Sequence, residues 1–222
     1  MTMPPQRLRR LAATLGGLLM LGVTTACAQQ PANPPATNAP DAGTSGQSAV
    51  AIFAGGCFWC MEPPFDELPG VTATTSGYIG GHVADPSYQQ VSAGGTGHTE
   101  AVRVNYNPAQ VSYATLLDVF WRNIDPVAVD RQFCDVGDQY RSAIFTTDAQ
   151  QKRLAEASKR ELQTSGRFER PIATEIAAAP TFYPAEQYHQ DYYEKNPVRY
   201  KFYSFTCGRQ QRLDEVWGAA GE

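Results

Sequence analysis

The chain alternates short apolar stretches with polar connections in a way that predicts several β-strands. Residues 48–54 form an apolar run of the kind found in buried strands. Residues 71–81 and 99–106 instead alternate apolar with polar positions, which is typical of strands with one buried face. Two later stretches, residues 139–147 and 172–178, predict further strands.

Three stretches of the same region have the spacing of amphipathic helices. Ser112, Asp148 and Pro184 are suitable first residues for them, and Pro197 ends the third. A glycine-rich connection, residues 80–98, is long enough to carry function. Because strands and helices mix without strict βαβ alternation, we expect one α+β domain built as a two-layer sandwich. The predicted helices span residues 112–124, 148–162 and 184–195.

The first 28 residues have the three parts of an export signal. Residues 7–10 are rich in arginine, residues 11–23 are apolar, and residues 24–28 are small. About thirteen apolar residues are too few to span a bilayer, which disfavours an anchor that stays attached. Residues 29–48 are rich in Pro, Ala, Gly, Ser, Thr and Asn, and we expect them to form a disordered linker to a domain at 49–222.

Two processing sites compete at the end of the predicted signal. Ala26-Cys27-Ala28 fits ordinary signal peptidase, whereas Thr25-Ala26-Cys27 resembles a bacterial lipoprotein box with Cys27 as the lipidated residue. The Pro-rich linker favours the lipoprotein, because it suits a tether. We therefore expect a periplasmic, lipid-anchored protein of the bacterial cell envelope, with a soluble periplasmic protein cleaved at Ala28 as the alternative.

Charge and cysteine content narrow the possible functions of the domain. The formal net charge of −4 leaves no basic footprint and argues against a nucleic-acid partner. With Cys27 used in processing, four cysteines remain: Cys57, Cys60, Cys134 and Cys207. Their scatter through a domain that is large enough to fold without disulfides disfavours a purely structural disulfide framework.

The strongest chemical signal is the hexapeptide GGCFWC at residues 55–60, which follows the first predicted strand. Cys57 would open a helix, where free backbone N–H groups favour the thiolate, so we expect a lowered pKa and a reactive thiol. Pro63-Pro64 predicts a kink or a restart of that helix. An inert buried cysteine is the alternative for Cys57.

Other uses of the two cysteines fit less well. Haem attachment needs a histidine where Met61 stands, and zinc needs a second Cys/His pair at short spacing, which is absent. A thioredoxin-like redox pair would need a βαβ context. Phe58 and Trp59 are the kind of residues that usually pack in a core, but beside a nucleophile they could form a small apolar pocket for a methyl or thioether group.

Five motifs, in order along the chain and beginning with the hexapeptide GGCFWC, carry a resemblance to a known family. They read GGCFWCMEPPFDELPGV, TSGYIGGHVADPSY, GTGHTEAVRVNY, QFCDVGDQYRSAIF and YHQDYYEKNP. Together they resemble the A-type peptide-methionine sulfoxide reductases, enzymes specific for the S-epimer, over almost the whole domain. The resemblance implies a ferredoxin-like mixed sheet with helices packed on it.

The resemblance also assigns roles to individual residues. Cys57 is implied as the nucleophile, Glu100 as the proton donor, and Phe58 and Trp59 as the cradle of the S-methyl group. Tyr88 and Tyr140 are implied to hydrogen-bond the sulfoxide oxygen, while Asp135 orders the site.

These roles make chemical sense, because sulfoxide reduction needs a soft nucleophile for sulfur and an acid for the departing oxygen. Alone, each residue has a plainer interpretation. Glu100 could be an exposed strand carboxylate, Asp135 a turn residue, and Tyr88 and Tyr140 packing residues. His189 is interpreted as a structural histidine with satisfied hydrogen bonds.

The implied cycle passes through a sulfenic acid on Cys57, a disulfide with a second cysteine and reduction by a thioredoxin-like dithiol protein. Cys60 is the expected resolving cysteine because it lies in the same helical turn. Cys207 is the next candidate and could pass the disulfide outward, while Cys134 could simply pack beside the site. No metal or organic cofactor is implied, the substrate is oxidised methionine, and a monomer is expected.

Two other functions stay open at this point. One is a general thiol-disulfide oxidoreductase that uses Cys57 and Cys60. The other is a lipid-anchored binding protein that holds a ligand in the aromatic pocket.

Overall fold

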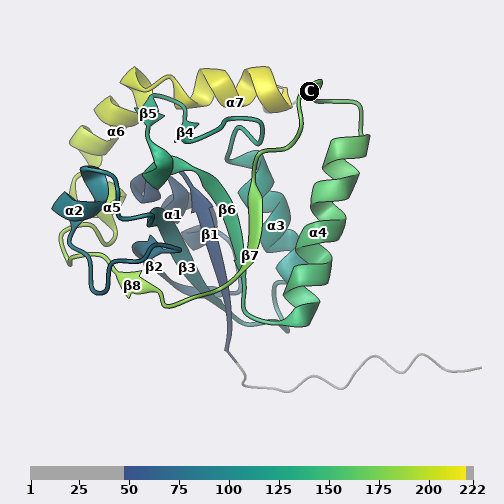
Figure 1. Cartoon of the computed structure of the whole chain (residues 1–222), viewed down its shortest axis with the longest axis horizontal. Coiled ribbons are helices and arrows are strands. Elements are labelled where there is room, and N and C mark those ends of the chain that lie inside the picture. Colours follow the sequence, from purple (N-terminus) through teal and green to yellow (C-terminus); the bar gives the residue numbers. More distant parts are fainter. Residues whose placement is uncertain (1–47, 219–222) are drawn as a thin grey trace, which may run out of the picture. The chain divides into compact units, whose positions relative to one another are not determined.

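The computed structural model describes residues 48–218 and centres on a six-stranded mixed β-sheet (Figure 1). The strand order is β7-β6-β1-β3-β2-β8, and only the β6/β7 pair is parallel. The run β6-β1-β3-β2 is the antiparallel order of a ferredoxin-like sheet. The strands are β1 (Ala49–Gly55), β2 (Val71–Ile79), β3 (Thr99–Tyr106), β6 (Ser142–Thr146), β7 (Glu175–Ala178) and β8 (Tyr183–Pro184).

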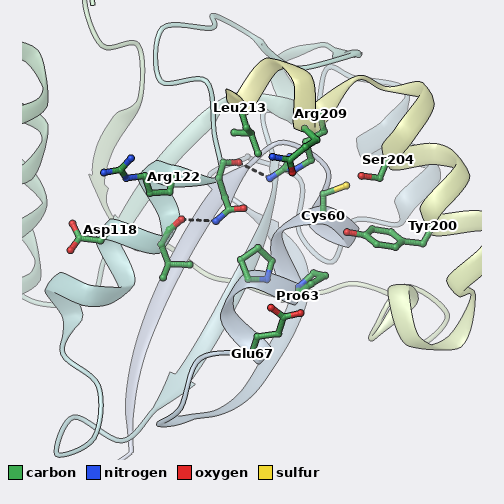
Figure 2. A pocket seen from close by; sticks show the side chains of 13 residues that line it. Cys60, Pro63, Glu67, Asp118, Arg122, Tyr200, Ser204, Arg209 and Leu213 are labelled. Atoms are coloured by element: carbon green, nitrogen blue, oxygen red, sulfur yellow. Dashed lines mark hydrogen bonds between the residues drawn. The ribbon is translucent and has the colours of Figure 1, made fainter. Parts of the chain in front are cut away.

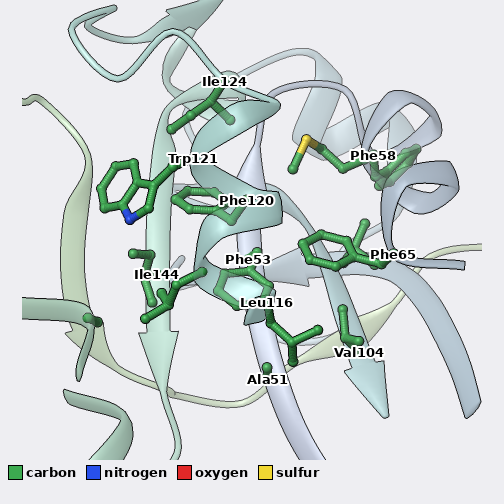
Figure 3. Packing of buried hydrophobic residues seen from close by; sticks show 14 of the residues in the cluster. Ala51, Phe53, Phe58, Phe65, Val104, Leu116, Phe120, Trp121, Ile124 and Ile144 are labelled. Carbon is green, nitrogen blue, oxygen red and sulfur yellow. The ribbon is translucent and has the colours of Figure 1, made fainter. Parts of the chain in front are cut away.

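Helices cover one face of this sheet and enclose the main core. They are α1 (Phe58–Asp66), α3 (Tyr113–Arg122) and α4 (Ala149–Thr164), the last of which connects the parallel strands β6 and β7. Figure 3 shows Phe53 of β1 between Phe65 of α1 and Phe120 of α3, and both ring pairs stack at 5.2 Å. A smaller apolar cluster, including Ile52, covers the other face. The predicted α+β sandwich with a ferredoxin-like sheet is confirmed.

The sheet topology brings three segments together at one end. Because β1 is antiparallel to both neighbours, its C-terminal end lies beside the first residues of β3 and β6. Gly55 pairs with Ser142, and Phe53 pairs with Val102. Cys57 follows β1, Glu100 stands at the start of β3, and Tyr140 comes just before β6. The candidate site therefore gathers where these strands begin and end.

Most predicted elements are present, but the strand predicted at 139–147 is shorter, and a 3-10 helix, η1 (Asp138–Tyr140), precedes it. The connection at 80–98 contains a short helix, α2 (Tyr88–Ser92), that begins with a capping box at Ser87. Pro63 and Pro64 lie inside α1 and do not restart it, because α1 is one helix through Asp66. The two prolines supply no backbone N–H for the hydrogen bonds of the helix. Burial of the inner side chains Phe58, Met61 and Phe65 in the core offsets this loss.

The helix predicted at 184–195 is wrong except in its last turn. Pro184 belongs to β8, which pairs with β2, and the side chain of Gln190 bonds both N–H and C=O of Ser76. Asp191 has a left-handed backbone, so the helix α5 (Tyr192–Lys195) starts only after it. Tertiary hydrogen bonds have replaced those of a local helix.

Pro197 begins a helix instead of ending one. It is the first residue of α6 (Pro197–Thr206), which is followed by α7 (Arg209–Trp217). A second, two-stranded sheet joins β4 (Arg131–Gln132) to β5 (Asp135–Val136).

The predicted export signal (1–28) and nearly all of the predicted linker (29–48) lie outside the described residues and stay predictions. Within residues 48–218, no helix combines the length and apolar character that crossing a membrane would require.

Candidate active site

Cys57 occupies the N-cap position of α1, directly after two glycines. Gly56 has φ +85, and a Cβ there would lie 2.5 Å from Cβ of Gln132. A Cβ on Gly55 would meet Met61 sulfur at 2.6 Å. The glycine pair is therefore needed for the tight turn that leads from β1 into the cysteine.

The Cys57 side chain is only 8 % exposed and accepts no capping hydrogen bond from α1. Burial raises the pKa of Cys57 well above its usual value. The expected lowering of this pKa by the helix N-terminus is therefore wrong for this state, because desolvation of the thiolate outweighs the dipole. The raised pKa favours the protonated thiol at neutral pH in this structure.

Cys60, one turn later, is 4 % exposed and is the second free thiol among the described residues. A side-chain hydrogen bond with Cys57 lowers the pKa of Cys60, and the charge of Arg209 acts in the same direction. The backbone N–H of Cys60 also donates to the Cys57 carbonyl at 3.0 Å. The two sulfur atoms are thus held on the same turn of α1.

Glu100 lies at the start of β3, opposite Tyr78 of β2, and is 2 % exposed. Its Oε2 atom accepts a hydrogen bond from the backbone N–H of Phe58 at 3.0 Å, which fixes the carboxyl beside the residue that follows Cys57. Burial raises the pKa of Glu100 to about 8, although the Phe58 hydrogen bond lowers it in part. Glu100 is therefore largely protonated at neutral pH, and it is not an exposed strand carboxylate.

The two predicted oxygen-binding tyrosines, Tyr88 and Tyr140, lie within the electrostatic reach of Glu100. Tyr88 stands in the first turn of α2, and its backbone N–H donates to Glu186 at 2.8 Å. Burial, then the neighbouring charge of Glu100, raises the pKa of Tyr88 to about 12, and the same two causes raise the pKa of Tyr140. Both phenols therefore stay protonated and can donate hydrogen bonds.

Asp135 of β5 lies half-buried within the electrostatic reach of both cysteines of α1. Burial raises the pKa of Asp135, while a hydrogen bond from Tyr203 and the charge of Arg209 lower it. The structure thus brings Cys57, Glu100 and Asp135 together from three separate strand ends, as the sequence motifs predicted.

Aromatic residues form one wall of this site. Trp59 stacks on Tyr192 at 3.7 Å, and its indole N–H donates to Nδ1 of His189 at 3.0 Å. Phe58 is buried in the main core and contacts the His189 ring at 5.1 Å, whereas Trp59 is only half-buried. Trp59 is therefore the more accessible part of the predicted methyl-binding wall.

Sequence reasoning assigned His189 only a structural role and missed the contacts of Tyr192 and Tyr203. The prediction that His189 is satisfied is half correct: Nδ1 has a partner, but the buried Nε2 has no hydrogen bond within the described residues. The aromatic cluster YHQDYY was the available signal for His189 and Tyr192, whereas Tyr203 lies beyond this cluster and beyond the helix predicted at 184–195.

A cavity of about 570 Å³ reaches Cys60 between α1, α3, α6 and α7. Figure 2 shows Cys60 beside Tyr200 and Arg209 at this cavity. Cys57, Glu100 and the predicted sulfoxide-binding tyrosines do not line it. The cavity therefore gives access to the second thiol and does not mark the substrate site.

Cys134 and Cys207 are joined in a disulfide with a Cα–Cα distance of 5.0 Å. The prediction that Cys134 only packs beside the site is wrong, and Cys207 is not a free thiol in this state. The pairing could not be foreseen because 73 residues separate the two positions. Cys134, Asp135 and Cys207 cluster closely enough for a metal, but the disulfide engages both sulfur atoms.

Comparison with known proteins identifies the family of this chain. The family model "Peptide methionine sulfoxide reductase" matches residues 49–220. The peptide methionine sulfoxide reductase MsrA of Listeria monocytogenes is 50% identical over 167 residues, covering 75% of this chain and 94% of the relative. The MsrA of Ligilactobacillus salivarius is 50% identical over 168 residues, covering 76% and 97%.

Two solved structures have the same fold. The reduced form of Mxr1 from Saccharomyces cerevisiae is 32% identical with a TM-score of 0.65, covering 68% of this chain and 87% of that one. Methionine sulfoxide reductase A of Corynebacterium diphtheriae is 36% identical with a TM-score of 0.62, covering 69% and 78%. With the family match extending over the whole described domain, the chain belongs to the peptide methionine sulfoxide reductases of the MsrA type.

Proposed function

We propose that this enzyme reduces the S-epimer of methionine sulfoxide, free or within proteins, with Cys57 as nucleophile and Glu100 as acid. The observation that carries the proposal is the buried Glu100 carboxyl, bonded to the Phe58 N–H at 3.0 Å and protonated at neutral pH beside the Cys57 thiol. A thiol and a protonated carboxyl in a dry, aromatic site are the groups that sulfoxide reduction requires.

In the first step, the Cys57 sulfur attacks the sulfoxide sulfur while Glu100 protonates the oxygen, and the proton released by the Cys57 thiol returns Glu100 to its acid form. Tyr88 and Tyr140 donate hydrogen bonds that stabilise the charge developing on that oxygen. The methionine S–O bond breaks and an S–O bond forms on Cys57. The balance is one thiol and one sulfoxide converted to one sulfenic acid and one methionine, with Cys57 losing two electrons.

In the second step, the thiol of Cys60 attacks the Cys57 sulfenic acid, and water leaves as the Cys57–Cys60 disulfide forms. Placement on the same turn supports Cys60, because residues three apart in a helix share one face. The helix must loosen slightly, since a disulfide needs Cβ atoms nearer than about 4.5 Å.

The last step returns the inner pair to thiols. Exchange of the Cys57–Cys60 disulfide with the Cys134 and Cys207 thiols would leave the outer pair oxidised and the inner pair reduced, which is the state of the structure. Cys134 is exposed, so a thioredoxin-like dithiol protein can attack the outer disulfide there. No metal or organic cofactor enters this cycle.

The test is turnover of the separate S and R epimers of a blocked methionine sulfoxide with dithiothreitol as reductant. We expect methionine from the S epimer only. Reduction of the R epimer alone would contradict the proposed specificity, and reduction of insulin disulfides without sulfoxide turnover would indicate a general thiol-disulfide oxidoreductase.

We also propose that the enzyme repairs oxidised proteins of the bacterial cell envelope and is anchored there by lipid at Cys27. The signal-like segment and the Pro-rich linker support this placement. Mass spectrometry of the mature N-terminus tests it, because an unmodified terminus at Gln29 would indicate a soluble periplasmic enzyme instead.

A further inference from the structure

Helix α6 lies over the active site but is held there through one face only. No residue of α6 is buried, and Val198, Phe202 and Phe205 are among the most exposed apolar residues of the described chain. Tyr200 and Tyr203 lie three residues apart along another face of the helix, and Cys207 caps its end. Burial of apolar surface therefore contributes little to the position of this helix.

Besides the packing of Tyr200 on Tyr193 of α5, three contacts of α6 and its C-cap end on groups of the redox site. The hydroxyl of Tyr200 lies toward Cys60 (Figure 2). Tyr203 donates a hydrogen bond to the Asp135 carboxylate, and Cys207 is bonded to Cys134. The attachment of α6 and the chemistry of the site thus depend on the same residues.

Tyr203 connects the polar and the apolar halves of the site. Its hydroxyl donates to Oδ2 of Asp135, and its ring meets Trp59 edge-on with centroids 5.9 Å apart. Burial, with the neighbouring charges of Cys57 and Asp135, raises the pKa of Tyr203, so the phenol remains a donor. A shift of Tyr203 would therefore move both a charged group and the predicted methyl-binding wall.

The disulfide closes a short ring around this contact. Cys134 directly precedes Asp135, and Cys207 follows Tyr203 by about one helical turn. We propose that the Cys134–Cys207 disulfide positions Tyr203 against Asp135 and Trp59, and that its oxidation state sets the rate at which Cys57 reduces the sulfoxide. A dithiol that reduces this bond transfers two electrons to it, is itself oxidised to a disulfide, and leaves two thiols that no longer fix α6.

Tyr203 is a positioning residue in this proposal, which rests on the proposed function. The experiment measures the first turnover, because release of one methionine per enzyme needs Cys57 but no resolving or recycling cysteine. Enzyme whose Cys57 and Cys60 are reduced is mixed, without added reductant, with excess S-epimer peptide, quenched, and assayed for methionine. We expect Tyr203→Phe and Cys134→Ser each to slow this step by roughly 10- to 100-fold, as for loss of a hydrogen bond to a charged group.

The double variant distinguishes positioning from two independent losses. The double variant combines Tyr203→Phe with Cys134→Ser. If the disulfide acts through Tyr203, the first turnover of this variant is no slower than that of the slower single variant, whereas two independent effects would multiply. Tyr203→Phe keeps the ring and should leave the half-saturating peptide concentration unchanged. Tyr203→Ala should raise that concentration, because Trp59 loses the edge contact with the Tyr203 ring.

Two controls keep the outcome interpretable. Tyr193→Phe removes a similar bond, from a tyrosine hydroxyl to Asp66 at 3.1 Å, but keeps the ring that packs on Tyr200, and it should leave the first turnover unchanged. Wild-type enzyme with all four thiols reduced should release its first methionine at the same rate as Cys134→Ser. This measurement does not depend on correct folding of the variant. Unchanged methionine release in Cys134→Ser and in the reduced enzyme, or multiplying effects in the double variant, would overturn the proposal. Failure of wild-type enzyme to release methionine would instead refute the proposed function.

Discussion

The two cysteine pairs of this domain lie close to the same active site but in opposite chemical situations. Cys57 and Cys60 are three residues apart on one helix, buried, and present as free thiols. Cys134 and Cys207 are 73 residues apart, partly exposed at the surface, and joined. Short spacing in the sequence therefore did not determine which pair is bonded.

The difference follows from local geometry and solvent access. Within a helical turn, side chains at i and i+3 have Cβ atoms about 5–6 Å apart, farther than a relaxed disulfide allows. Cys134 and Cys207 come from separate elements that can approach freely, and Cys134 is open to dithiols and oxidants. The buried pair thus suits the reaction with substrate, and the surface pair suits exchange with a protein reductant.

Cys57→Ser tests the most basic difference between the pairs and should have the largest effect. A serine hydroxyl is a poor nucleophile toward sulfur, so we expect no methionine above background even in a single turnover. The matched control is Cys207→Ser, which should still release one methionine per enzyme, more slowly than the wild type. Retained turnover in Cys57→Ser would show that Cys57 is not the nucleophile.

Glu100→Gln examines the acid that accompanies the inner pair and should slow the first turnover by about 10²–10⁴. The pKa of Glu100 is raised to about 8, so the proton is present below that pH and lost above it. The acceleration that the Glu100 proton gives to the wild-type rate should therefore disappear as the pH rises through 8. The Gln variant has no such proton, so its rate should not show this decrease. Stopped-quench rates between pH 6 and 9 measure both effects.

Cys60→Ser separates the first step from the resolution of the sulfenic acid. The first methionine should appear at nearly the wild-type rate, after which steady turnover with a protein dithiol should drop by at least about tenfold, because the resolving thiol is missing. Peptide mass mapping of the trapped enzyme checks the intermediate. A Cys57–Cys207 bond that forms at full rate would transfer the resolving role to the surface pair.

Reduction of the surface disulfide should produce the smallest effect, on stability. Opening a link that closes a 73-residue loop costs about 4 kcal/mol by the chain-entropy argument, or roughly 10 °C in Tm. Calorimetry of Cys134→Ser against wild type measures this change. Cys60→Ser breaks no disulfide in the resting protein and serves as the control, so an equal loss of Tm there would contradict the comparison.

Local signals predicted the N-terminal part of the domain well and the C-terminal part poorly. β1, β2, β3 and α3 followed their apolar patterns because their own side chains supply the core around Phe53. Residues 184–191 instead form hydrogen bonds to β2 and turns, and α6 contains no buried residue to leave a periodic pattern. A pattern-based prediction has little to detect where tertiary contacts or a single disulfide position the chain.

The sequence by itself determined the main strands and the family resemblance, because strand periodicity and motifs are local properties. That resemblance in turn implied the ferredoxin-like sheet and the site candidates Cys57, Glu100, Tyr88, Tyr140 and Asp135. Only the tertiary structure decided that Cys134 pairs with Cys207, that burial raises the pKa of Cys57, and that Tyr203 reaches Asp135. Each of these depends on which distant segments pack together and exclude water. Neither burial nor a contact between residues about 70 positions apart can be read from the order of the residues alone.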